Sequence, residues 1–162
     1  MMDVLETIRT KRAVRRFSDQ PVPDDVIDQI LNAGRRSQSS RNDQPWQFIV
    51  IRDRERLAAV SRTGSYAGHI AGAAFAVVLV GEQPGDWISF DLGQAAAYMQ
   101  LAAWGLGVGS CIATLHHEDA AKKLLGIPAE RSVMVALSFG YPAPDWTPHK
   151  GGRRKLDDVV RR

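Results

Sequence analysis

Cysteine is nearly absent from this chain of 162 residues, in which Cys111 is the only one. No disulfide can form within the chain, which excludes the disulfide framework of small secreted proteins. A lone thiol fits a reducing compartment, so we expect the protein to be cytoplasmic. The first residues include Asp3 and Glu6 and contain no apolar stretch, so we expect no secretory signal.

Positive charge is missing from the middle of the chain. There is no Lys or Arg between Thr63 and Ala121, although the formal net charge is +3. The basic residues gather near the two ends, in Lys11–Arg16 and Arg153–Lys155. They indicate either an anion site shared by both ends or two solvated basic surfaces, which is the usual role of charge runs. Neither run has interleaved aromatics or a DNA-binding motif, so we expect no nucleic-acid partner.

An uninterrupted apolar run long enough to cross a membrane is also missing. Residues 95–113 approach the ~20 residues of a span, but Gly105, Gly107 and Gly109 break the run. We interpret it as a buried helix followed by a buried strand and expect no membrane association. A hydrophobic content of 44% and a charged content of 24% are ordinary for a soluble globular protein. The length fits one domain over residues 1–162.

Hydrophobic periodicity predicts alternating helices and strands, which indicates an α/β or α+β class. The predicted helices are 3–9, 24–33, 54–61, 86–105 and 118–125, and the predicted strands are 47–52, 74–80, 108–113 and 132–139. Helix 86–105 is apolar on nearly every side, as in helices buried in a core or an interface, and we favour an interface. Residues 140–162 are rich in proline and predict an extended arm.

The segment Ser39–Trp46 concentrates polar groups between a predicted helix and a predicted strand. It offers two hydroxyls, two side-chain amides and an aromatic ring. Loops of this kind commonly display binding groups, and an ordinary polar turn is the alternative interpretation. Together with the two basic runs, the segment predicts a site for a flat, polar-edged ligand that carries an anionic group.

Other motifs carry little chemistry by themselves. His116 and His117 are adjacent, but no Cys/His set with metal-ligand spacing surrounds them, so we expect no metal site. The glycines of residues 105–109 follow a helix instead of a strand, which is the wrong order for a dinucleotide-binding loop. Cys111 lies in a predicted apolar strand, and we expect a core residue.

The order of the motifs resembles the nitroreductase family of flavin enzymes. The family patterns are Arg-Arg-Ser-Val-Arg-x-Phe, Ser-Ser-x-Asn-x-Gln-Pro-Trp, Gly-x-Gly-Ser-Cys, Gly-Tyr-Pro, and a basic pair before Leu-acid-acid-Val. They match residues 11–17, 39–46, 107–111, 140–142 and 153–159. The resemblance implies an α+β fold with a mixed, mostly antiparallel sheet flanked by helices, and one flavin-binding domain. It also implies a homodimer with sites at the subunit interface, across which the C-terminal arm reaches.

The resemblance further implies FMN as the cofactor and assigns its contacts. Near the phosphate and ring edge it places Lys11, Arg12, Ala13 (where the family often has serine) and Arg15, the last at the N1–O2 edge. The ribityl chain or ring edge would contact Ser39, Ser40 and Asn42, in a loop supported by Gln44. The backbone N–H groups of Thr114 and Leu115 would approach N5. Arg153 and Arg154 would contact the phosphate. The basic N-terminal run has an alternative interpretation as a solvated helix end.

The implied activity is NAD(P)H-dependent reduction of nitroaromatics, quinones or similar acceptors by ping-pong hydride transfer. No side chain is expected to act as acid or base. The alternatives are a flavin carrier without turnover and specialised flavin chemistry, such as dehalogenation or azoline oxidation. The segment between Val80 and Asp86 is too short to form a long lid, so the sequence does not indicate which substrate the protein uses.

Overall fold

The computed structural model describes residues 3–149 and 151–162. One four-stranded antiparallel sheet lies at its centre, in the order β1-β2-β4-β3. The strands are β1 (Trp46–Ile51), β2 (Phe75–Gly81), β3 (Gly109–Thr114) and β4 (Ser132–Gly140). The helices are α1 (Val4–Thr10), α2 (Asp24–Arg35), α3 (Arg54–Ser61), α4 (Asp86–Gly105) and α5 (Glu118–Leu125). The α+β class is confirmed, and every pair of these strands is antiparallel.

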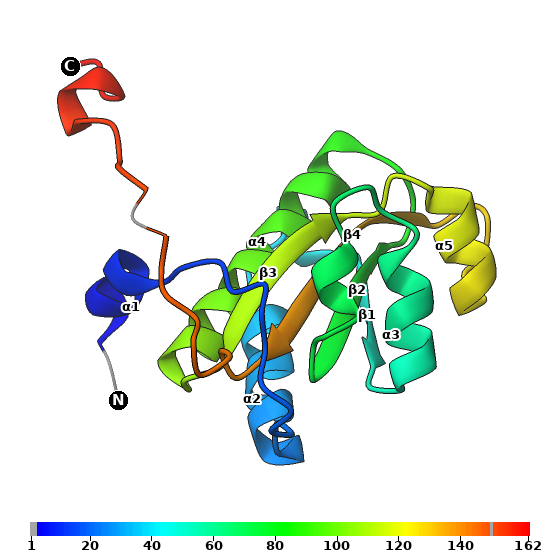
Figure 1. Cartoon of the computed structure of the whole chain (residues 1–162). Coiled ribbons are helices and arrows are strands. Elements are labelled where there is room, and N and C mark those ends of the chain that lie inside the picture. Colours follow the sequence, from blue (N-terminus) through cyan, green and yellow to red (C-terminus); the bar gives the residue numbers. More distant parts are fainter. Residues whose placement is uncertain (1–2, 150) are drawn as a thin grey trace.

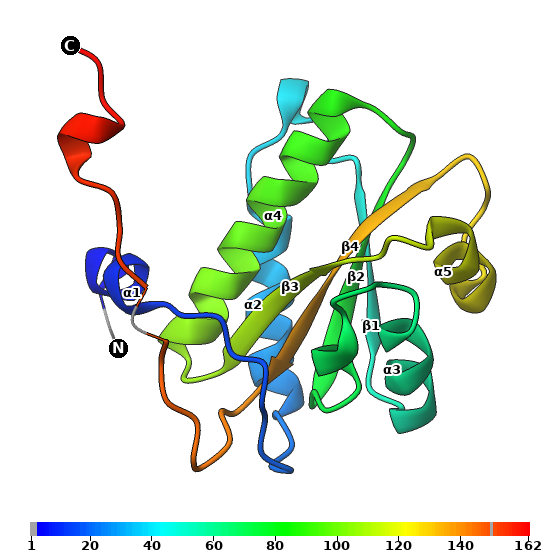
Figure 2. The same cartoon turned by 45° about the horizontal axis from the view of Figure 1, so that its top comes forward.

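Helices cover both faces of the sheet (Figures 1 and 2). α2 and α4 lie on one face, over Val77 and Leu79, whereas α3 and α5 lie on the other, over Ala76 and Val78. Successive side chains of a strand point to opposite faces, which explains why β2 is buried along its whole length. The predicted central strand is thereby confirmed.

The helix α4 is apolar on both its buried and its exposed sides. Leu92 and Met99 pack into the core, at 2% and 0% exposure. On the other side, Trp87 and Phe90 are 70% and 59% exposed. An apolar helix face open to solvent is typical of a surface that another molecule covers.

The glycines before β3 allow the chain to turn and to be approached closely. Gly107 has φ 77°, a left-handed conformation that glycine adopts without a steric cost. A Cβ at Gly109 would come within 2.6 Å of Val14 Cγ2. Glycine at 109 therefore lets the N-terminal segment lie directly against the start of β3.

The two ends of the chain run together before they diverge. Phe17 and Pro142 form an antiparallel bridge, and the Ser18 N–H donates to Tyr141 O at 2.9 Å. Beyond this point the C-terminal arm runs past α1 and away from the sheet (Figures 1 and 2). All of its residues from Gly151 onward are exposed. The predicted extended arm is confirmed.

The local predictions differ from the structure mainly at short helical turns. The 3-10 turns Ser40–Asn42, Gly68–Ile70 and Leu156–Asp158 were not predicted, because so short an element has no periodicity to detect. The limits of strands β1 to β3 differ by one residue. In the part of the chain that the structure describes, no helix has the length and apolarity needed to cross a bilayer.

Candidate functional site

The basic N-terminal segment is held against the free edge of the sheet. The Val14 N–H donates to Ser110 O at 3.0 Å, and Ala13 and Ser110 form a parallel bridge. Val14 is 0% exposed and anchors the segment in the core. β3 is an edge strand, so this contact places Lys11 and Arg15 beside an edge that no other strand covers within residues 3–149 and 151–162.

Lys11 and Arg15 lie close to Cys111 on β3. Burial lowers the pKa of Lys11, which is further lowered by Arg15 and raised by Cys111. Burial also raises the pKa of the Cys111 thiol, against the opposing influence of Arg15 and Lys11. Cys111 is 2% exposed, as expected for a core residue. Its position beside two cations was not predicted, because strand periodicity says nothing about a neighbour nearly one hundred residues away.

His69 adds a titratable group to the same region, which the sequence did not indicate. Its Nδ1 lies 2.8 Å from Ser138 Oγ, and Ser138 Oγ donates to Cys111 O at 3.3 Å. The hydroxyl of Ser138 has one proton, so when it donates to Cys111 O, Nδ1 of His69 is the donor to Ser138. Burial lowers the pKa of His69, and Arg15 lowers it further. Arg15 is therefore the cation that acts on both His69 and Cys111.

Arg12 makes a different contact. Its Nη1 donates to Arg9 O at 3.0 Å and to Lys11 O at 2.8 Å. These carbonyls belong to the C-terminal end of α1, where cations meet the negative end of the helix dipole. In this structure Arg12 thus makes the contact that the helix-end interpretation predicts.

The loop Ser39–Gln44 is compact and has an unusual backbone. Arg41, Asn42 and Gln44 have φ values of 51°, 60° and 51°. Positive φ is uncommon outside glycine, although asparagine tolerates it. Ser39 Oγ accepts the Gln44 N–H at 2.9 Å, and the Ser40 N–H donates to Asp91 Oδ2 of α4 at 3.1 Å. The side chain of Ser39 therefore supports the loop from within.

The loop and the basic segment meet α4 at different places. The loop contacts Asp91, whereas Trp104 Nε1 donates to Thr10 Oγ1 at 3.0 Å, next to the basic segment. At about 1.5 Å per residue, these two contact points are about 20 Å apart along the helix. Within one chain, the predicted loop contacts and the predicted cations therefore do not surround one ligand.

The two predicted N5 donors differ in their backbone bonding. The Leu115 N–H donates to Met134 O of β4 at 2.9 Å, so it is committed within the sheet. Along an antiparallel strand, the backbone N–H and C=O groups of successive residues point alternately toward the partner strand and away from it. Ser110, which accepts from Val14, faces away from β4, and Thr114 faces away with it. Thr114 is thus the member of the pair whose N–H points away from β4, on the side where Gly64 lies against Thr114 O.

The remaining predicted residues lie on the arm. Arg153 and Arg154 are exposed, and Arg154 Nη2 donates to Asp158 O at 2.5 Å. The arm carries them away from the sheet of their own chain. Among the described residues, no group of three or more His, Cys, Asp or Glu side chains is arranged to hold a metal ion.

Comparison with known proteins identifies the family. The profile of the nitroreductase family matches residues 8–66 and 56–141, which is most of the chain. A protein of Archaeoglobus fulgidus, provisionally named NADH dehydrogenase/NAD(P)H nitroreductase, is 32% identical over 100% of this chain and 98% of its own length. The chain belongs to the nitroreductase family.

Solved structures of nitroreductases share the fold. A provisionally named nitroreductase from Desulfovibrio desulfuricans, in complex with FMN, is 28% identical and superimposes with a TM-score of 0.84. The match covers 99% of this chain and 96% of that one. The NADPH:FMN oxidoreductase of Vibrio harveyi, complexed with NAD+, has a TM-score of 0.90 at 22% identity, covering 98% of this chain and 76% of the other. At that identity the second likeness shows the fold alone.

Proposed function

We propose that the protein is an FMN-dependent oxidoreductase that takes electrons from NAD(P)H and passes them to nitroaromatics, quinones or similar acceptors. The observation that carries the proposal is the attachment of the basic segment to the free edge of β3 through Val14 and Ser110. Membership of the nitroreductase family and the likeness to an FMN complex support it. The lone buried thiol is consistent with action in a reducing cytoplasm.

The donor groups of this chain suit the chemistry of FMN. A phosphate needs cations, which Lys11 and the two arginines of the arm supply. The alternating donors and acceptors of the pyrimidine edge match hydroxyls and amides of the kind that Ser40 and Asn42 carry. Thr114 offers a backbone N–H on the side of β3 that faces away from β4. When bound, FMN supplies the N5 centre that accepts and returns two electrons with a proton.

The residues of the chain would hold and tune that group. Arg15 has a fixed positive charge and would favour the negative charge that the N1–O2 edge gains on reduction. Lys11 would neutralise the phosphate, and partial burial strengthens this interaction because less water screens it. The Thr114 N–H would orient the ring, and the apolar β3 side chains would exclude water from one of its faces. None of these residues needs to transfer a proton.

A homodimer would bring the separated groups together. The loop Ser39–Gln44 of one protomer would meet the basic segment of its partner, because the contacts of these two segments with α4 lie about 20 Å apart in one chain. An isologous contact of this kind produces two identical sites. The C-terminal arm would cross to the partner, which explains why it packs so little on its own chain.

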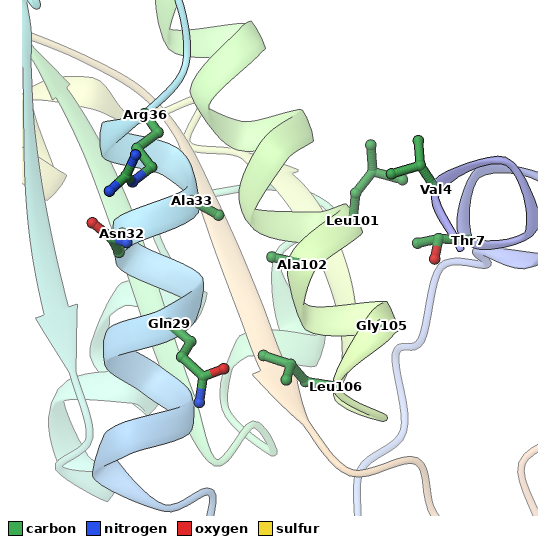
Figure 3. Close-up of a pocket in the computed structure, with 10 residues that line it drawn as sticks. All are labelled: Val4, Thr7, Gln29, Asn32, Ala33, Arg36, Leu101, Ala102, Gly105 and Leu106. Carbon is green, nitrogen blue, oxygen red and sulfur yellow. The ribbon is translucent and has the colours of Figure 1, made fainter. Parts of the chain in front are cut away.

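Uncovered apolar surface supports the dimer. A groove of about 480 Å³ runs between α1, α2 and α4. Figure 3 shows Val4 and Leu101 directed toward each other across it, with Gln29, Asn32 and Arg36 on the α2 side. The apolar residues Val4 and Leu5 of α1 are 72% and 78% exposed. A permanent dimer interface typically buries more than ~2,000 Å², and these surfaces would contribute to it.

Titration with FMN, followed by anaerobic mixing with NADH or NADPH, tests the proposal. The expected result is a yellow complex whose colour is bleached within seconds by a reduced nicotinamide and returns with a quinone or nitroaromatic. A chain that binds no FMN at low salt contradicts the proposal entirely. A complex that binds FMN but is not bleached identifies a flavin-binding protein without turnover. Sedimentation of the loaded protein should show a dimer at micromolar concentration.

A further inference from the structure

Asp91 is a buried charge in an unusual place. It is 3% exposed and is the only charged side chain classed as buried among residues 3–149 and 151–162. It lies on the otherwise apolar core side of α4, next to Leu92. Within the same residues it forms no ion pair. A buried carboxylate is unfavourable unless hydrogen bonds compensate it, and the Ser40 N–H supplies one to Oδ2 at 3.1 Å.

The loop that Asp91 holds is strained. Arg41, Asn42 and Gln44 have positive φ, and such conformations persist only when the surrounding structure holds them. Inside the loop, Ser39 Oγ holds the Gln44 N–H at 2.9 Å. These contacts shape the loop itself but do not fix it relative to the rest of the protein.

The loop is not packed tightly on α4. A cavity of about 260 Å³ lies between them, lined by Ser40, Arg41 and Pro45 on the loop side and by Asp86 and Trp87 on the helix side. The bond from Ser40 to Asp91 lies at this cavity, which both residues line. A second bond, from Gln38 Nε2 to Gln94 Oε1 at 2.8 Å, joins the residue before the loop to α4 outside the cavity. The first involves a buried charge, and the second is exposed. Asp91 is therefore the stronger of the two supports.

We propose that Asp91 is a positioning residue for the ligand-binding loop. Its carboxylate fixes the backbone of Ser40 over the cavity, so that Ser39, Ser40 and Asn42 face the ligand in one arrangement. The identity of that ligand, FMN, rests on the proposed function above. The role of Asp91 in positioning the loop of the unliganded protein does not depend on the identity of the ligand.

The first test combines hydrogen exchange with FMN titration. In Asp91→Ala, we expect the amides of residues 40–44 to exchange faster in the unliganded protein. FMN binding should weaken about 10- to 100-fold, the effect of losing a hydrogen bond to a charged group. Asp91→Asn should recover most of the affinity, because its amide oxygen can accept the same N–H. Asp28→Ala, which removes an exposed acid of α2, is the control, with an affinity within about threefold of wild type, as for a surface change.

A second pair of variants removes the donor and leaves Asp91 in place. Ser40→Ala loses the hydroxyl and keeps the N–H, whereas Ser40→Pro loses both. Proline is tolerated at the first position of a helical turn. The proline variant should bind FMN about tenfold more weakly than the alanine variant, which corresponds to a net hydrogen bond to a charged group.

The outcomes separate the two proposals. Wild-type exchange at residues 40–44 in folded Asp91→Ala, or equal affinities of Ser40→Pro and Ser40→Ala, overturns the role of Asp91. If Asp91→Ala does not fold, the Ser40 pair decides. A wild-type chain that binds no FMN overturns the proposed function instead, and the exchange rates of the unliganded protein still decide the role of Asp91.

Discussion

The Val14 N–H donates to Ser110 O at 3.0 Å, and this bond joins the basic segment to the edge strand. Residues far apart in sequence thereby place Lys11 and Arg15 beside Cys111. The edge of β3 becomes a positively charged surface in a part of the chain that has no Lys or Arg of its own.

Arg15→Ala should lower the midpoint potential of bound FMN. A hydrogen bond to a charged group is worth about 1.5–3 kcal/mol, and we expect a differential effect of about 1–2 kcal/mol between the redox states. For a two-electron couple this corresponds to roughly 20–45 mV. Arg15→Lys should keep part of the effect, and reduction by NAD(P)H should slow. Spectroelectrochemical titration of the FMN-loaded variants measures the midpoint potential.

Arg16→Ala is the matched control for this experiment. Arg16 is the adjacent cation, and it pairs with Asp145 at 2.6 Å in an exposed position. Its removal should leave the midpoint unchanged. An unchanged midpoint in loaded Arg15→Ala would place Arg15 away from the N1–O2 edge. Arg153→Ala should instead weaken FMN binding and leave the potential nearly unchanged.

Two defective chains should complement each other. Lys11→Glu damages the phosphate contact, and Asn42→Asp removes an amide donor while tolerating the positive φ at that position. In a mixed dimer, one site carries both changes and the other carries neither, because the groups come from different protomers. FMN stoichiometry in isolated mixed dimers measures the recovery of one site. If both groups served one site from the same chain, every site of the mixed dimer would remain defective.

Gly109→Ala should destabilise the protein and displace the basic segment. The new Cβ would lie 2.6 Å from Val14 Cγ2, and Val14 is fully buried. Overpacking of this kind typically costs about 1–3 kcal/mol. FMN affinity should also fall, because a displacement of Val14 would move the adjacent residue Arg15 away from the ligand. Urea unfolding measures the first effect. Gly72→Ala is the control, since its Cβ would meet no atom within 4 Å.

His69 should make stability depend on pH. Burial and Arg15 lower its pKa below the ordinary value of 6.5, so the unfolded chain takes up the proton more readily. The contribution of neutral His69 is complete above about pH 6.5 and is lost as the pH falls through the folded pKa. The slope for one proton is at most about 1.4 kcal/mol per pH unit. Urea unfolding at several pH values should show that the free energy of unfolding falls less at low pH in His69→Gln than in the wild type. Identical pH dependence in the two proteins would exclude His69 as the source.

Local signals explain what could be predicted from the sequence. The limits of α4 and α5 agree with the predicted ranges, because α4 begins at an acid after a glycine and α5 ends at Gly126 in the left-handed conformation. β2 could be predicted because a strand buried on both faces reads as a continuous apolar run. Each of these signals lies within or next to its own element.

The rest depends on contacts that no local pattern encodes. The bond between Ser40 and Asp91 joins residues 51 positions apart, and Asp91 could be read from the sequence only as an acid in an apolar helix. The sequence also did not indicate that the Leu115 N–H would be committed to β4. A signal did exist for Gly109, which is part of the Gly-x-Gly-Ser-Cys pattern, but its close contact with Val14 is apparent only in the fold.

The separation of the loop and the basic segment along α4 has a consequence for regulation. Under the proposed two-chain site, a free protomer holds two half-sites and no whole one. The number of working sites then follows the concentration of paired chains, so activity per chain falls on dilution below the dissociation constant of the dimer. FMN that bridges two protomers would oppose this loss, and the supply of cofactor would itself control how many chains are assembled.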